Sequence, residues 1–137
     1  MKIALRQVAL PELGVPDDRP TIPMAEYEAH CAALFAGAGA EWVAVYGDRE
    51  HLGNLVFLTG FDPRFEETLL LLGADGRRVL LVGNEGIFHA QVAGVPLDVT
   101  LYQPFSLMGQ PRDLSPPRPD LLRGIGPREG DQVAVVG

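Results

Sequence analysis

The sequence predicts an α/β domain of three layers (α/β/α), in which helices cover both faces of a mixed sheet of five or six strands. Two neighbouring segments, 68–72 and 79–82, are apolar at almost every position. Strands that are apolar on both faces lie in the middle of a layered domain. The turn between them, 73–76, is short enough to make the two strands antiparallel. An amphipathic segment at 23–38 supplies a helix for one covering layer.

The helix at 23–38 is the clearest one in the sequence. Pro23 suits the first helical turn, and Gly39 follows the last one. The spacing of the apolar residues places them within an arc of about 100°. That stripe consists of Met24, Tyr27, Cys31, Leu34, Phe35 and Ala38. Cys31 is therefore predicted to be an inert core thiol, whereas His30 is predicted to lie away from the stripe.

Three further segments are predicted to be strands because they are short and rich in β-forming residues: 42–46, 99–102 and 132–136. The last has the composition of a buried strand, and we take its position before Gly137 to indicate a chain cut at a domain boundary. Residues 1–22 are expected to form an N-terminal extension, with a possible strand at 2–10 followed by turns. The domain itself is predicted to span 23–137.

The remaining segments are predicted to be short helices and loops. Helices are expected at 51–58, 87–93 and 119–123. The segment 104–119 contains five prolines and few large apolar residues, so we expect a surface loop there.

Composition excludes several function classes. Eleven basic and eighteen acidic residues give a net charge of −7, which disfavours nucleic acids and anionic membranes as partners. A single cysteine cannot form an internal disulfide. No apolar run reaches the twenty residues that a membrane span requires, so we expect a soluble, cytoplasmic protein.

Common catalytic motifs are absent from the sequence. The histidines at 30, 51 and 89 fall in three separate segments, without the spacing of a metal site. Ser106 and Ser115 are the only serines, and neither lies in a Gly-x-Ser-x-Gly motif. Because Lys2 is the only lysine, there is no phosphate-binding loop of the Gly-x-x-x-x-Gly-Lys type. No residue is predicted to be catalytic or to bind a metal.

Two polar clusters remain as candidate sites. Residues 48–51 follow a strand and are expected to cap the next helix. Residues 61–67 are denser and bring together aromatic rings, an arginine and carboxylates; the candidate residues are Phe61, Asp62, Arg64, Phe65 and Glu66. One interpretation is a solvated connection in which Glu66 and Glu67 protect the start of a strand. The other is a projecting loop that binds a charged ligand or a neighbouring subunit, which two exposed rings would favour slightly.

The segment 54–61 reads Asn-Leu-Val-Phe-Leu-Thr-Gly-Phe and lies between the strand at 42–46 and the hairpin. With these elements and the closing strand, the chain from Pro23 to Gly137 resembles the N-terminal domain of the creatinase, prolidase and Xaa-Pro aminopeptidase family. Phe57 stands where the family often has tyrosine. The resemblance implies the creatinase N-terminal fold, with its ribonuclease H-like motif.

In that family the catalytic residues belong to a second domain of pita-bread fold, which holds two divalent metal ions such as Mn, Co or Zn. None of its ligand motifs occurs in this sequence. The resemblance therefore implies a non-catalytic accessory domain without a cofactor of its own. Its expected partners are its own C-terminal catalytic domain and a second copy in a homodimer, with a peptide substrate contacted only indirectly. It also implies that the loop 61–67 contacts the dimer partner or shapes substrate access.

Two other interpretations remain open. The chain could be a stand-alone binding module of the same architecture, whose acidic surface would suit basic protein partners. It could also be a small-molecule enzyme, although no residue is a candidate acid or base for that role. If a large partner domain is absent, an apolar surface should be left uncovered, and we then expect the chain to self-associate.

Overall fold

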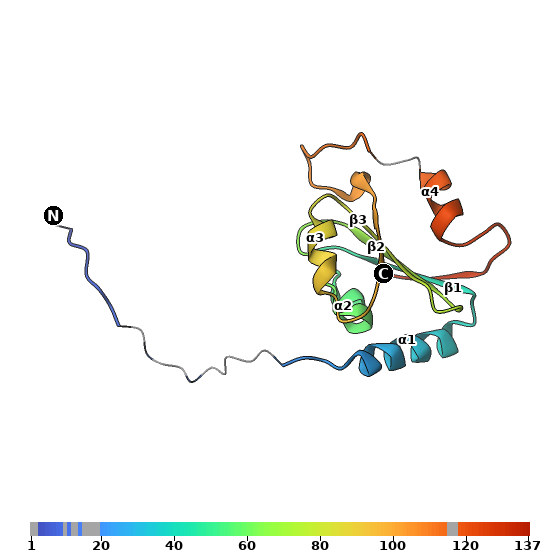
Figure 1. The fold of residues 1–137 in the computed structure, drawn as a ribbon, viewed down its shortest axis with the longest axis horizontal. Coiled ribbons are helices and arrows are strands. Elements are labelled where there is room, and N and C mark those ends of the chain that lie inside the picture. The colour runs from blue at the N-terminus through green and yellow to red at the C-terminus, as the bar shows by residue number, and fades with distance from the viewer. Residues whose placement is uncertain (1–2, 10, 12–13, 15–19, 115–117) are drawn as a thin grey trace.

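The computed structural model describes residues 3–9, 11, 14, 20–114 and 118–137. Its centre is a five-stranded sheet with the order β4-β3-β2-β1-β5 (Figure 1). The strands are β1 (Trp42–Gly47), β2 (Thr68–Gly73), β3 (Arg78–Val82), β4 (Asp98–Leu101) and β5 (Val133–Val136). β2 pairs antiparallel with β1 and β3, whereas β4 and β5 are parallel to their neighbours. The predicted mixed α/β sheet is confirmed.

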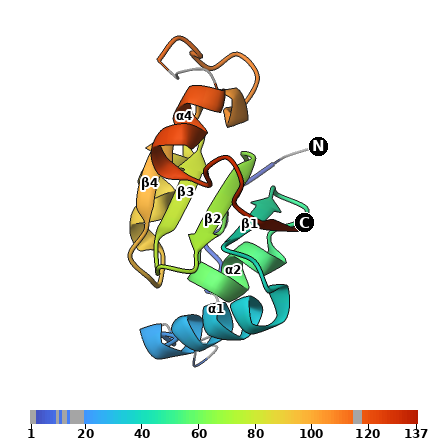
Figure 2. The same ribbon diagram turned by 90° about the vertical axis from the view of Figure 1, so that its right-hand side faces the viewer.

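Helices lie on both faces of this sheet. They are α1 (Met24–Ala38), α2 (Gly53–Thr59), α3 (Gly86–His89) and α4 (Arg118–Ile125), with 3-10 turns η1 (Ala90–Val92) and η2 (Gln103–Phe105). α1 and α2 cover one face, while η2 and α4 lie over the other, as Figure 2 shows with the sheet between them. The arrangement has three layers, as predicted.

The neighbouring strands β2 and β3 are apolar at every position except their first residues, Thr68 and Arg78, because their side chains enter two cores. In β2, Leu70 and Leu72 point towards α1 and α2, and Leu71 points to the opposite side. In β3, Leu80 joins the first core and Leu81 the second. Side chains alternate between the faces of a strand, so a strand buried on both faces is apolar at nearly all its positions.

α1 packs on the sheet through part of the predicted stripe. Tyr27 and Cys31 are buried, whereas Met24 at the first turn is exposed, because the helix extends past the edge of the core there. His30, predicted to lie outside the stripe, is half-buried and stacks on the Phe57 ring at a centroid distance of 3.7 Å. The burial of Cys31 among the core residues confirms the prediction of a core thiol, and burial also raises the pKa of this thiol.

Two predicted strands differ in the structure. Residues 3–9 form no strand, because they lie away from the domain and have no neighbouring strand to pair with (Figure 1); the other two residues of that prediction, 2 and 10, lie outside the described residues. β5 is not a buried strand. It forms an edge of the sheet, and Val133 and Val135 are exposed because none of the described helices covers that part of the face.

The proline-rich loop is held by buried hydrogen bonds that its composition does not predict. Gln103 is buried, and its side-chain amide donates to Asn84 Oδ1 at 2.9 Å and accepts from the Leu114 N–H at 2.6 Å. Ser106 is also buried and accepts the Asn84 N–H. These hydrogen bonds attach the segment after η2 to the loop before α3. Residues 115–117 of the predicted loop lie outside the described residues, and α4 begins directly after them.

Candidate functional site

The predicted site loop begins where α2 ends. Thr59 Oγ1 donates to the Leu55 carbonyl at 2.7 Å and accepts the Phe61 N–H at 3.1 Å. Gly60 follows the helix with a φ of 71°, a left-handed conformation that favours glycine. A Cβ at this position would also lie 2.7 Å from the Tyr27 hydroxyl. The Thr-Gly-Phe segment therefore ends the helix and directs the chain into the loop.

The two phenylalanines of the loop point in opposite directions. Phe61 is 1% exposed and belongs to the core beneath α1 and α2, so the expectation of two exposed rings is wrong for this residue. Phe65 is 57% exposed. Between them Asp62 Oδ1 accepts the Arg64 N–H at 2.9 Å, and Arg64 takes a φ of 60°. This turn carries Phe65 outward after Phe61 has entered the core.

Glu66 lies inside the protein, although it was a candidate contact residue. Its side chain is 2% exposed, and its carboxylate accepts the N–H groups of Glu85 at 3.2 Å and Gly86 at 2.9 Å. These are free backbone donors at the start of α3. A Cβ on Gly83 would lie 2.6 Å from the carboxylate, so the backbone packs closely around it. Glu66 attaches the loop to α3 and is not part of a solvated connection.

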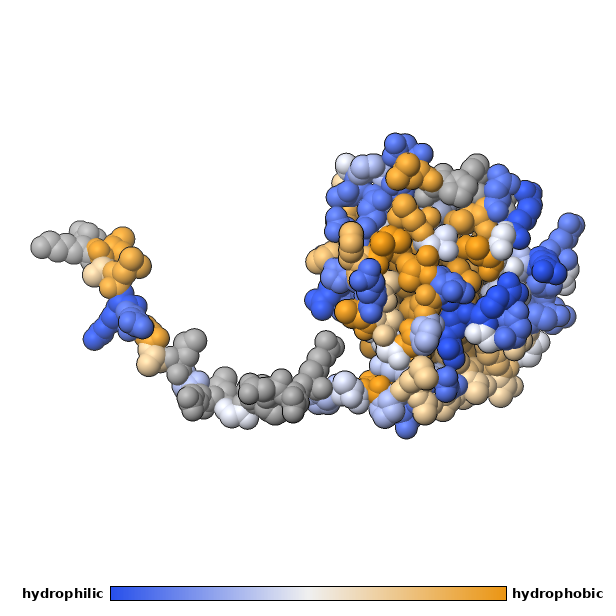
Figure 3. All heavy atoms as spheres, viewed as in Figure 1, coloured by the Kyte–Doolittle hydropathy of each residue, from blue (hydrophilic) through white to orange (hydrophobic). Residues whose placement is uncertain are grey.

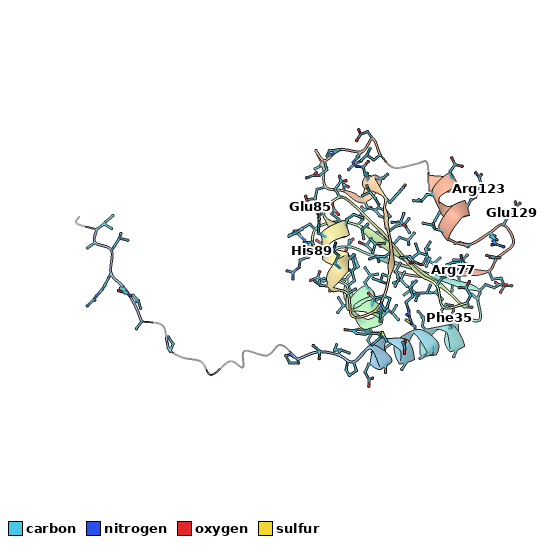
Figure 4. All side chains as sticks on the ribbon, in the orientation of Figure 1. Phe35, Arg77, Glu85, His89, Arg123 and Glu129 are labelled. Carbon is cyan, nitrogen blue, oxygen red and sulfur yellow. The ribbon has the colours of Figure 1, made fainter. Side chains whose placement is uncertain are left out.

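Apolar side chains lie exposed on the α3 side of the molecule. The Phe65 ring contacts the His89 ring edge-on, with the ring centroids 6.5 Å apart. Phe88 in α3 is 74% exposed, and Val92 in η1 is 81% exposed. Figure 4 shows His89 and Glu85 on this side. We call Phe65, Phe88, His89 and Val92 the Phe65 surface. Phe88, His89 and Val92 were not predicted as site residues. The pattern that could have indicated them is the apolar pair Phe88 and Val92, four residues apart in the predicted helix 87–93.

The structure does not bring the three histidines together. His30 contacts Phe57, His51 lies 3.0 Å from Asp48 Oδ1, and His89 contacts Phe65. Among the described residues, no group of three or more histidine, cysteine, aspartate or glutamate side chains could hold a metal ion. In the same part of the chain, no helix has the length and apolar character needed to cross a bilayer.

The second predicted cluster stabilises a turn. Asp48 Oδ1 accepts the N–H groups of Glu50 at 2.8 Å and His51 at 2.7 Å, and α2 begins only at Gly53. The carboxylate was expected to cap the helix, but it holds the connection that precedes it. The hydrogen bond from the His51 N–H is the main cause that lowers the pKa of Asp48 below its ordinary value.

The Asp48 turn should make stability depend on acid pH. Because the pKa of Asp48 is lower in the folded chain, its stabilising contribution is complete above the unfolded-state pKa and is lost as the pH falls through the folded one. In urea unfolding at a series of pH values, Asp48→Asn should lose less stability on acidification than the natural chain. Asp98→Asn, at an exposed position of the sheet edge, is the control and should follow the natural chain. Parallel curves for all three proteins would contradict this role of Asp48.

The chain is similar to a solved structure, but it matches neither a family model nor a curated protein. Among solved structures, it is similar to an Xaa-Pro aminopeptidase from Streptococcus pyogenes, with 28% sequence identity and a TM-score of 0.42. The similarity covers 56% of this chain and 54% of that one, so the chain matches about half the length of that structure.

Proposed function

We propose that this chain is a non-catalytic N-terminal domain of an Xaa-Pro aminopeptidase-like or creatinase-like hydrolase. In this proposal it supports dimerisation and shapes substrate access to a catalytic domain. One observation carries it: the segment 54–61, which contributes to the family resemblance, leads directly into a turn that presents Phe65 to solvent. An exposed ring at the tip of a well-anchored turn is suited to contact another polypeptide.

The anchoring of that turn supports a contact role. On one side Phe61 is fixed in the core, and on the other the Glu66 carboxylate is fixed to the backbone of α3. Asp62 and Arg64 between them are linked by an ion pair of 3.4 Å. Phe65 and Arg64 are thus held outward by a fixed backbone. The turn would lose little conformational freedom on binding, which lowers the entropic cost of binding.

The proposed domain supplies no catalytic group of its own. The family's two divalent ions would be held by the catalytic domain, and the described residues of this chain offer no cluster of ligands for them. In this proposal, peptide hydrolysis belongs to the longer protein. The contribution of this chain would be to place Phe65 and Arg64 beside the partner's substrate entrance.

The test uses the longer protein that the proposal requires, read in frame beyond Gly137. It should contain the five metal ligands of the family's catalytic domain, which are two aspartates, a histidine and two glutamates, and it should cleave Xaa-Pro peptides. Residues 1–137 with manganese or cobalt should show no turnover. In the longer protein, Phe65→Ser should lower kcat/KM by about tenfold, mainly through KM, because it removes a contact at the substrate entrance.

Phe57→Ser is the matched control, because Phe57 is a phenylalanine of similar exposure that lies outside the loop. It should leave kcat/KM unchanged. Metal-dependent hydrolysis by residues 1–137 alone would overturn the proposal. A stop codon after Gly137, or a continuation without the ligands, would instead favour a stand-alone binding module.

A further inference from the structure

The N-terminal segment is apolar but has nothing to pack against in its own chain. Residues 3–9 extend away from the domain, and all their side chains are exposed (Figure 1). Ile3, Leu5 and Val8 are its large apolar members, and Arg6 is its only charged residue. We call residues 3–9 the arm. Apolar side chains that remain in water lose the free energy that burial would give, so a surface that covers the arm is expected.

The domain has an apolar groove on the sheet face that carries η2 and α4. Its volume is about 330 Å³, and it is lined by Tyr46, Glu67, Leu69, Leu81, Tyr102, Phe105 and Leu122. Figure 3 shows apolar atoms exposed in the region between η2 and α4. The groove arises because α4 covers β2 and β3 only in part, which leaves space beside Leu69 and Leu81. It is deep enough to receive one or two aliphatic side chains.

The charges of the groove and the arm are complementary. Glu67 is the only carboxylate in the lining of the groove, and it forms no ion pair with any described residue. Burial, together with the negative charges of Glu67 and Asp48, raises the pKa of Tyr46 beside it. Arg6 likewise has no acidic partner among the described residues. An apolar segment with one arginine therefore matches an apolar groove with one free carboxylate.

The position of the arm points to the groove of another molecule. In the structure the arm does not occupy the groove of its own chain: it extends away from the domain, and all its side chains are exposed (Figure 1). A second copy can receive the arm in its groove, and two copies related by a twofold axis can exchange arms reciprocally.

We propose that the arm of one copy docks in the groove of a second copy, with Arg6 paired to Glu67 and with Leu5 and Val8 against the apolar wall. This arm-exchanged dimer goes beyond the proposed function. It uses a surface different from the Phe65 surface, and it does not depend on any peptidase activity.

The test measures the mass of the full chain by light scattering and by sedimentation over a range of concentrations. The natural chain should form a dimer. Arg6→Glu and Glu67→Arg should each weaken dimerisation at least tenfold, because each places two like charges together. The double variant, which restores an opposite pair, should recover most of the loss. Arg128→Glu and Glu129→Arg reverse charges in the loop before β5, where Figure 4 labels Glu129, and should leave the dimer unchanged.

A second measurement shows which molecule receives the arm. A spin label on an Ala4→Cys variant, mixed with an isotope-labelled natural chain, should broaden the amide signals of Glu67 and Leu69 in the labelled copies. A dimer that ignores both charge reversals would overturn the proposal. So would a monomer at high concentration, whether its arm is free or docked within the same molecule. A dimer lost in Phe65→Ser but kept in Arg6→Glu would assign self-association to the Phe65 surface, and would also overturn it.

Discussion

Replacing Phe61 with alanine is expected to lower the free energy of unfolding by about 3–5 kcal/mol, the range measured for buried aromatic side chains. Phe61 is almost fully buried and contributes to the core beneath α1 and α2. Its removal leaves a cavity that the neighbouring Leu55 and Leu58 of α2 cannot fill without moving the helix. Urea unfolding followed by circular dichroism measures the loss.

Phe65→Ala is the matched control from the same loop. Because more than half of Phe65 is exposed, this change should alter the unfolding free energy by less than about 0.5 kcal/mol. Equal losses for the two variants would mean that Phe65 is also a core residue. The pair therefore separates the structural ring of the loop from the one proposed to make contacts.

Glu66→Ala is expected to lower the free energy of unfolding by about 2–3 kcal/mol, since two backbone N–H groups at the start of α3 lose their acceptor. The loss should be concentrated locally. Hydrogen exchange of the amides in α3 and η1 should accelerate more than exchange in β2, because the carboxylate joins the loop to α3 without contacting the centre of the sheet.

Two further variants test this interpretation of Glu66. Glu66→Gln keeps an acceptor oxygen and should lose less stability than the alanine variant. Glu67→Ala, at an exposed position next in the chain, should change stability by less than about 0.5 kcal/mol when measured on dilute protein. An equal effect at both glutamates would contradict the specific attachment of Glu66 to α3.

The fold could be predicted because its central part is locally encoded. The two apolar runs and the short turn between them determine the antiparallel pair β2 and β3, and burial on both faces follows from composition. The edge strand β5 was predicted less well. Its valines look like those of a buried strand, and whether a helix covers them depends on where α4 packs, which no local pattern records.

The candidate loop was found from its composition, but the roles of its residues were not. Phe61 and Phe65 are the same residue type four positions apart, and only the left-handed turn at Gly60 and the turn at Arg64 send one inward and the other outward. Glu66 looks like its neighbour Glu67 in the sequence. Its burial depends on the backbone N–H groups of Glu85 and Gly86, about 20 positions later in the chain.

The parallel pairing of β1 with β5 has a consequence for how the protein is made. β1 to β3 are complete at Val82, whereas the partner of β1 on its other side is complete only at Val136. The indole N–H of Trp42 donates to the Asp131 carboxylate at 3.1 Å, so this hydrogen bond also forms only after Asp131 has been synthesised. During synthesis on the ribosome the three-stranded part can form early, while one edge of β1 stays open until β5 emerges. The edge strand β5 therefore joins last, and until then β1 is the part of the nascent chain most exposed to wrong pairing.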